Sequence, residues 1–148
     1  MKVNVVDSAL TYINYSIFAK GLQNIVIKLS TYSILRRILS LAARKFTSTL
    51  VELRLGQNKI LGLNFGNVFA LAGNLKAIDL GNNWLNDLDD IKDLQKLGLK
   101  SLRLDGNPLC AKYSFAGEYI QAVKSRFPQL TTLVSWITDI YFCIYKDI

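Results

Sequence analysis

The side chains best suited to bind a charged ligand are basic and lie in the first third of the chain. Residues 1–50 contain seven lysines and arginines against one acidic residue, in a chain of 148 residues with a formal net charge of +7. The candidates for phosphate contacts are Lys28, Arg36, Arg37, Arg44 and Lys45. A basic surface of this kind attracts polyanions, and nucleic acid is the usual one. A face of lysines and arginines that contacts only solvent is the alternative interpretation.

The residue types that most enzymes and zinc sites require are scarce. The chain contains no histidine and only two cysteines, Cys110 and Cys143. Histidine is the commonest acid–base group near neutral pH, and with cysteine it supplies most zinc ligands. The sequence shows neither a nucleophile beside a base nor a phosphate-binding glycine loop. We therefore expect two reduced thiols, no cofactor, no small-molecule substrate and a protein that is not an enzyme.

Three aspartates stand close together and could in principle hold a cation. Asp87, Asp89 and Asp90 do not have the spacing of a calcium loop. They precede a run of apolar residues at helical spacing that ends at Gly98. Acidic residues at a helix start and a glycine beyond its end are ordinary terminal signals. We predict a helix that begins at these carboxylates, and no metal site.

The elements that position these side chains follow from a repeated pattern. Leu53-Arg-Leu-Gly-Gln-Asn58, Ile78-Asp-Leu-Gly-Asn-Asn83 and Leu102-Arg-Leu-Asp-Gly-Asn107 share one spacing of leucines and asparagine. The asparagines Asn58, Asn83 and Asn107 are 25 and then 24 residues apart. This period and spacing are typical of leucine-rich repeats. In each repeat, alternate leucines of a short strand face the core, and the asparagine amide satisfies backbone groups where the chain leaves the strand.

Three further segments complete the predicted array. Residues 25–29 alternate like a degenerate first repeat, which makes about four parallel strands. Residues 32–46 have helical periodicity and predict an N-terminal amphipathic helix with arginines on its polar side. Residues 115–127 have apolar side chains at helical spacing until Pro128, which predicts a helix that closes the open end of the core. The fold class is therefore α/β, a short leucine-rich repeat solenoid.

The pattern also predicts the domain organisation. We expect one leucine-rich repeat domain over residues 22–133, preceded by an unassigned extension over residues 1–21. Residues 134–148 form an aromatic tail that is a new extension, an extra strand or the product of a truncated or divergent gene copy, and that either packs on the solenoid or contacts a partner. The apolar runs are too short or too interrupted to span a bilayer, so we expect no membrane association.

The strands offer a second candidate surface. If the leucines of the pattern face inward, the opposite side of the sheet displays charged side chains, namely Glu52, Arg54, Asp79, Arg103 and Asp105. Arg54, Asp79 and Arg103 would form one column on neighbouring strands about 4.8 Å apart. The column is either a ladder of alternating surface charges or a binding row.

Two adjoining motifs carry a family resemblance. Leu102-Arg-Leu-Asp-Gly-Asn-Pro-Leu-Cys110, followed by Tyr119-Ile-Gln-Ala-Val-Lys-Ser-Arg-Phe-Pro-Gln-Leu130, resembles the last repeat and closing helix of the leucine-rich repeat domain in nuclear RNA export factors, the Tap-like messenger-RNA export receptors. The resemblance covers roughly residues 22–133. The spliceosomal A′-type repeat protein is the nearest alternative, but it lacks the cysteine after the leucine.

The resemblance implies a role in messenger-RNA binding and nuclear export. In that family the repeat domain works beside an RNA-recognition domain and contacts protein adaptors, so RNA and an adaptor or export partner are the expected partners. The expected location is the nucleoplasm, with shuttling to the cytoplasm. The sequence lacks the family's RNA-recognition, dimerising and nucleoporin-binding domains, so we do not expect this polypeptide alone to support a complete export cycle. A protein-interaction scaffold without a nucleic-acid role is the alternative function.

Overall fold

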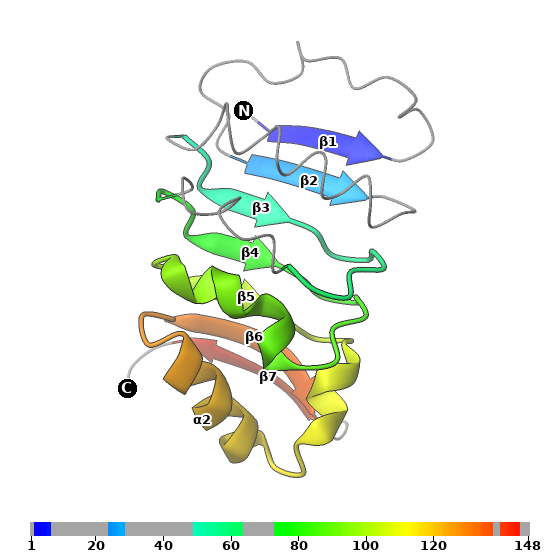
Figure 1. Cartoon of the computed structure of the whole chain (residues 1–148), viewed down its shortest axis with the longest axis vertical. Coiled ribbons are helices and arrows are strands. Elements are labelled where there is room, and N and C mark those ends of the chain that lie inside the picture. Colours follow the sequence, from blue (N-terminus) through cyan, green and yellow to red (C-terminus); the bar gives the residue numbers. More distant parts are fainter. Residues whose placement is uncertain (1, 7–23, 29–48, 64–72, 138–139, 146–148) are drawn as a thin grey trace.

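A single seven-stranded sheet organises the chain in a computed structural model (Figure 1). The structure describes residues 2–6, 24–28, 49–63, 73–137 and 140–145, with side chains described in 49–63 and 73–134. The strands are β1 (Lys2–Val6), β2 (Asn24–Lys28), β3 (Glu52–Arg54), β4 (Ala77–Asp79), β5 (Ser101–Arg103), β6 (Thr132–Ile137) and β7 (Ile140–Tyr145). They lie side by side in sequence order. Strands β1 to β6 are parallel, and β7 pairs antiparallel with β6.

The sheet is longer than the sequence pattern predicted. The four expected parallel strands are β2, β3, β4 and β5. Strand β1 adds a parallel neighbour before them, in the segment that had no assignment, and β6 adds one after them. Of the alternatives for the aromatic tail, the structure has strands, since β6 and β7 run through it. The predicted helix over residues 32–46 lies outside the described residues.

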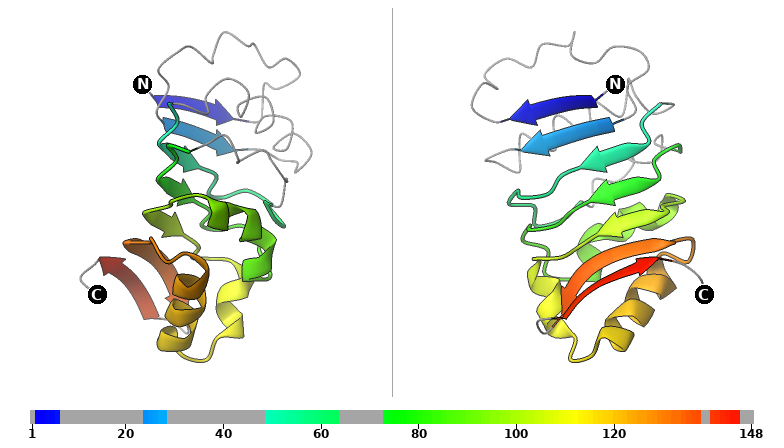
Figure 2. Two further views of the ribbon diagram at one scale, coloured as in Figure 1. Left: turned by 60° about the vertical axis from the view of Figure 1, so that its left-hand side comes forward. Right: turned by 180° about the vertical axis from the view of Figure 1, so that it is seen from behind.

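The described helices all cover one face of the sheet. They are the 3-10 helices η4 (Leu88–Lys96) and η5 (Pro108–Lys112) and the α-helix α2 (Ala116–Arg126). Figure 1 shows η4 and α2 in front of the strands, and the view from behind in Figure 2 shows the strands uncovered. The closing helix is confirmed as α2, and the helix after the aspartates is confirmed as η4, which is kinked at Ile91. We call the uncovered side of the sheet the open face.

The core lies between the sheet and these helices. The inward residues of the three complete repeats are at most 2% exposed, namely Leu53, Leu55, Ile78, Leu80, Leu102 and Leu104. Tyr119 and Val123 of α2 are fully buried at the end of the same cluster, so α2 closes the core as predicted. Burial of each such side chain stabilises the fold by about 1.5–3 kcal/mol.

A ladder of buried asparagines joins successive repeats. The Asn83 side-chain amide donates to the Leu80 carbonyl of its own repeat at 3.0 Å and to the Leu55 carbonyl of the preceding repeat at 3.0 Å. Its Oδ1 accepts a hydrogen bond from the Ile60 backbone N–H at 3.1 Å. Asn107 makes the same three kinds of contact one repeat later. Asn83 and Asn107 therefore satisfy backbone groups where the chain leaves the strand, as the sequence pattern predicted, and each does so in two repeats at once.

The residue before each asparagine adopts a left-handed conformation. Gln57, Asn82 and Gly106 have φ values of 59°, 53° and 67°. A Cβ atom on Gly106 would lie 2.2 Å from the Asn82 Oδ1 atom, too close for any contact without movement. Glycine at this position therefore allows the third repeat to approach the second.

Replacement of Asn83 by alanine should destabilise the protein. The Leu55 and Leu80 carbonyls keep the amides of Asn58 and Asn107 as donors, but the buried Ile60 N–H loses the acceptor that Asn83 provides. An orphaned buried donor costs about 1–3 kcal/mol. Urea unfolding monitored by circular dichroism measures this loss. Asn86→Ala is the matched control, because Asn86 is exposed, and an equal loss in both variants would contradict the ladder's role.

Replacement of Gly106 by alanine should also lower the free energy of unfolding. Left-handed backbone costs a residue with a side chain about 1–2 kcal/mol, and the clash with Asn82 adds to this cost. Gly117→Ala is the control, since its Cβ meets nothing within 4 Å and alanine suits the helix α2 better than glycine. Unfolding of the two variants should shift in opposite directions, and a neutral Gly106→Ala would contradict the close approach of the repeats.

Candidate functional site

The charged residues of the open face form the column that the sequence predicted. The sheet register places Arg54 opposite Asp79, and Asp79 opposite Arg103. Arg103 binds Asp105 in a bidentate arrangement, with Nε 2.5 Å from Oδ1 and Nη2 2.9 Å from Oδ2. Its Nη1 lies 3.7 Å from the Asp79 Oδ2 atom. The Arg103 guanidinium is therefore held by two carboxylates of the same face.

A glycine makes room for this cluster. A Cβ atom on Gly81 would lie 2.8 Å from the Asp105 Oδ1 atom and 3.0 Å from Arg103 Nε. The Gly81 backbone N–H instead donates to Asp79 Oδ1 at 2.9 Å. The ion pair of the third repeat thus depends on a missing side chain in the second.

The open face has no excess of positive charge among its five candidate residues. The expectation that Asp105 is displayed there is wrong, because only 6% of its side chain is exposed beneath Arg103. Arg54 pairs with Glu52 through contact of Nε and Oε1 at 2.5 Å, and 48% of its side chain is exposed. Two cations face three carboxylates on this surface, so the geometry favours a ladder of mutually paired charges.

The predicted phosphate-binding side chains of the N-terminal third lie outside the described side chains. Arg36, Arg37, Arg44 and Lys45 lie outside the described residues, and Lys28 is the last residue of β2, where only the backbone is described. Their role in phosphate binding stays a prediction.

The aspartate cluster caps the helix η4. The Asp87 carboxylate accepts the Asp89 backbone N–H at 3.1 Å, and Asp90 Oδ2 accepts the Asp87 N–H at 2.8 Å. Lys112 lies 2.9 Å from Asp87, and Arg126 lies 3.2 Å from Asp89. In the part of the chain that the structure describes, no group of three or more His, Cys, Asp or Glu residues could hold a metal ion.

Two charged groups of this cluster have perturbed ionisation. The hydrogen bond from Lys112 lowers the pKa of the Asp87 carboxyl below its usual value, and the Asp89 backbone N–H adds to this effect. The same hydrogen bond raises the pKa of Lys112. The ionised pair therefore ties η5 to the start of η4.

The described cysteine has a structural position. Cys110 is buried, and its Sγ donates to the Leu104 carbonyl oxygen at 3.3 Å. The buried thiol therefore packs under the third repeat. The Cys143 side chain lies outside the described side chains.

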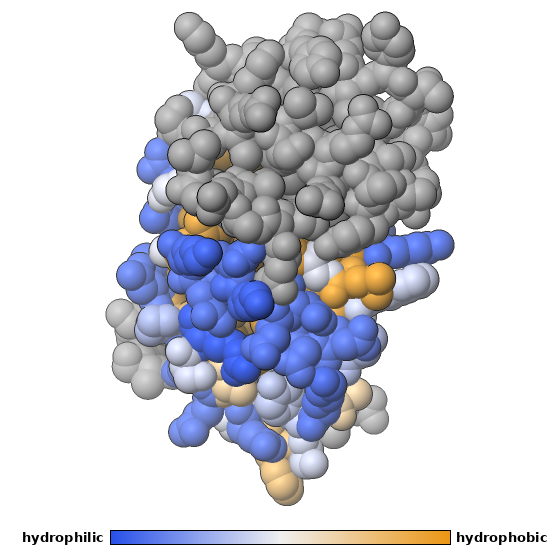
Figure 3. Space-filling view, in the orientation of Figure 1, coloured by the Kyte–Doolittle hydropathy of each residue, from blue (hydrophilic) through white to orange (hydrophobic). Residues whose placement is uncertain are grey.

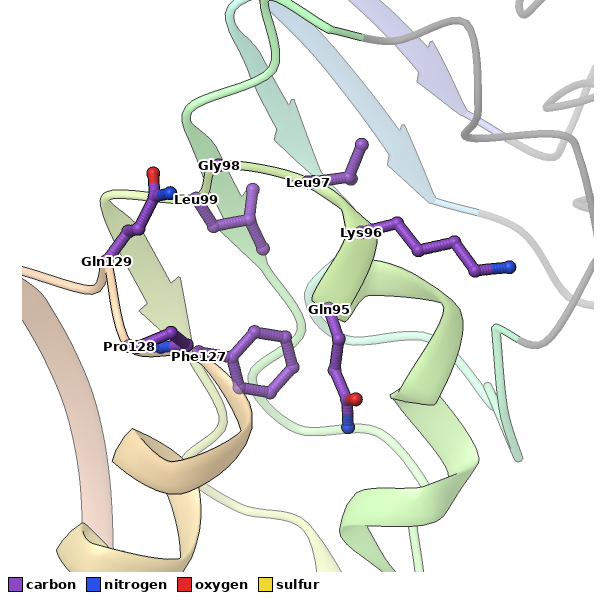
Figure 4. A pocket seen from close by; sticks show the side chains of 8 residues that line it. All are labelled: Gln95, Lys96, Leu97, Gly98, Leu99, Phe127, Pro128 and Gln129. Atoms are coloured by element: carbon purple, nitrogen blue, oxygen red, sulfur yellow. The ribbon is translucent and has the colours of Figure 1, made fainter.

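The structure brings together lysines that sequence reasoning missed. Lys76 and Lys100 directly precede β4 and β5, and both are exposed. Lys96 ends η4 close by and lines a hollow of about 100 Å³ (Figure 4). The other residues that line the hollow are Gln95, Leu97, Gly98, Leu99, Phe127, Pro128 and Gln129. The signal was present in the sequence, since Lys76 and Lys100 occupy the same position of successive repeats.

An exposed tryptophan was also missed. The side chain of Trp84 is 51% exposed, and the Lys59 ammonium lies 5.6 Å from its ring centroid. Both residues directly follow a ladder asparagine, so they adjoin at the edge where the strands end. Figure 3 shows that the described surface on the helical side is mostly hydrophilic, with few apolar side chains. In the described residues, no helix is both long and apolar enough to cross a membrane.

The architecture defines a class of protein. The chain has short parallel strands, one in each repeat, with a buried asparagine ladder and with helices on one side of the sheet. These are the features of a leucine-rich repeat protein. Comparison with protein families agrees, because residues 21–135 match the NXF1/2/3/5 leucine-rich repeat domain. This chain therefore belongs to the nuclear RNA export factor family. The matched family is a repeat domain of RNA export factors and is not an enzyme family.

Two curated relatives are similar over the repeat domain. Nuclear RNA export factor 2 of Drosophila melanogaster is 48% identical over 112 residues, which are 76% of this chain and 13% of that protein. Nuclear RNA export factor 2 of Homo sapiens is 32% identical over 85 residues, which are 57% of this chain and 14% of that protein. The chain thus spans only a small part of the length of these relatives.

Acid should remove the contribution of Asp87 to stability. Its pKa is lower in the folded state than the unfolded value of 3.8, so its stabilising effect is complete above that value and is lost as the pH falls through the folded pKa. Asp87→Asn keeps a side-chain oxygen for the cap but removes the charge. The variant should be slightly less stable at pH 7, because the pair is half exposed. Urea unfolding at several pH values should show the difference shrink as the pH falls below 3.8 and vanish below the folded pKa of Asp87, and a difference that stays constant over this range would contradict the ionic origin.

Proposed function

We propose that this chain is a non-enzymatic leucine-rich repeat module that takes part in messenger-RNA binding and nuclear export together with protein partners. Its membership of a family whose named relatives are nuclear RNA export factors carries this proposal. The charge distribution supports it, because the first 50 residues contain seven basic side chains and one acidic one. The expected place of action is the nucleus, with shuttling to the cytoplasm.

The proposed RNA contacts come from the basic N-terminal segment. Arg36, Arg37, Arg44 and Lys45, with Lys28, supply cations for phosphates. Such contacts raise affinity for any sequence and weaken steeply as salt is added. They do not by themselves select particular bases.

The open face suits a protein partner better than RNA. Its cations are already paired with carboxylates, and the five candidate residues carry one more negative than positive charge. Phosphates would have to displace Asp105 from Arg103, whose bidentate ion pair is a strong type of hydrogen bond. Arg54, half exposed beside Glu52, leaves a polar surface on which an adaptor protein could dock. A scaffold that binds only protein through this face is the second candidate function.

Neutralisation of the N-terminal arginines should weaken RNA binding. The test compares the intact chain with the triple variant Arg36→Gln, Arg37→Gln, Arg44→Gln by fluorescence anisotropy of labelled single-stranded RNA across a salt series. If each arginine contacts one phosphate, the salt slope should fall by roughly 2, since each contact in a single strand contributes about 0.7.

The control carries the same loss of charge elsewhere on the chain. Lys59→Gln, Lys112→Gln, Lys124→Gln removes three cations from the described part of the surface. Its salt slope should stay close to that of the intact chain. Undetectable binding of RNA by the intact chain at low salt, or equal slopes for the two triple variants, would overturn RNA binding in this form and favour the protein scaffold.

A further inference from the structure

The edge at which the strands begin carries a row of lysines. Lys76 and Lys100 precede neighbouring strands, and the Lys100 backbone N–H donates to the Lys76 carbonyl at 2.8 Å. The two residues are therefore held side by side, and both are exposed. Lys96 adds a third cation from the end of η4. We call Lys76, Lys96 and Lys100 the start-edge lysines.

Side chains from three repeats converge over one glycine at this edge. Measured from the position that a Cβ atom on Gly98 would take, the Gln129 Oε1 atom is 3.0 Å away and the Lys76 Nζ atom is 3.5 Å away. The Lys76 ammonium and the Gln129 amide oxygen thus both lie over a backbone position that has no side chain. Gly98 and Gln129 also line the hollow, and the Lys76 ammonium lies beside Gly98.

The hollow has an apolar floor and polar ends. Leu99 and Phe127 are 2% and 3% exposed, and they form its buried side. Figure 4 shows the Phe127 ring between the ends of α2 and η4, with Lys96 and Gln129 on opposite sides. Its volume of about 100 Å³ is well below the roughly 300–1,000 Å³ of pockets that enclose a whole small molecule. It can therefore receive one flat ring or sugar of a longer ligand.

The positive charge at this edge is paired with fewer carboxylates than the positive charge of the open face. Among the described residues, the carboxylate that pairs with a start-edge lysine is Asp93, 3.6 Å from Lys96. On the open face, by contrast, Arg103 is held by two carboxylates. A row of cations on neighbouring strands suits a chain of phosphates. A small hollow with Leu99 and Phe127 on its buried side and amides at its rim suits a base or ribose beside them.

We propose that the start-edge lysines and the hollow beside Gly98 form a second contact site for single-stranded RNA. Lys76 and Lys100 bind successive phosphates, and one base or ribose enters the hollow, where Gln95 and Gln129 offer hydrogen bonds to its polar groups. This proposal rests on the proposed RNA-binding function and locates part of it on the repeat array itself, apart from the basic N-terminal segment.

Two kinds of variant test the two halves of the site. Lys76→Gln, Lys100→Gln removes two cations, and its control Lys59→Gln, Lys112→Gln removes two cations away from this edge. For binding to labelled oligouridine, the first variant should lower the salt slope by roughly 1.4, at about 0.7 per contact in a single strand. The control should leave the slope unchanged.

Gly98→Leu fills the hollow without a change of charge, and Gly98→Ala serves as a smaller substitution if the first variant unfolds at a lower temperature. Each should weaken binding of oligouridine but not of inorganic polyphosphate, which has phosphates and no base. Equal effects on the two probes, or none on either, would overturn the base contact. Equal slopes for the two double-lysine variants would overturn the start-edge site while RNA binding by the intact chain stands, whereas loss of all binding by the intact chain would overturn the proposed function with it.

Discussion

The fold depends on the hydrogen-bond requirements of buried asparagine amides. Each ladder asparagine has two donors and an acceptor that must find partners, because an unsatisfied polar group in the core costs about 1–3 kcal/mol. Asn83 and Asn107 meet this demand only if consecutive repeats stand in one register, since each takes one carbonyl from its own repeat and one from the repeat before. The ladder therefore sets the distance and phase of the strands, and the leucine core fills the space that this phase defines.

Because the strands keep one phase, the position of a residue within its repeat determines where it lies on the surface. Residues one repeat apart lie side by side, which brings Asp79 next to Arg103 on the open face and Lys76 next to Lys100 at the start of the strands. The first pair has opposite charges, which neutralise each other. The second pair has like charges and is left to solvent or to a ligand. The same architecture thus produces a paired face and a basic edge from residues only a few positions apart in each repeat.

The paired face and the basic edge relate the family assignment to particular surfaces of the domain. The matched family and its relatives are named for RNA export, while the chain spans only 13% and 14% of those relatives. Among the described residues, the charges of the open face form ion pairs with one another, and Lys76 and Lys100 lie at the start of the strands. Under the proposed function, RNA and a protein partner use different surfaces of the repeat domain.

The sequence by itself determined the repeat period, the role of the asparagines where the strands end, the place of the aspartates at a helix start and the closing helix α2, because these features depend on contacts between residues at regular or short spacing. It did not reveal that β1 and β6 extend the parallel sheet, since their sequences lack the full repeat pattern and they become strands by pairing with neighbours already in place. Tertiary structure also decided that Asp105 is covered, because the space for its bidentate pair with Arg103 comes from Gly81, one repeat away. The hollow beside Gly98 has the same origin: Gln129 reaches its rim, and Lys76 lies beside Gly98, only after the repeats have stacked.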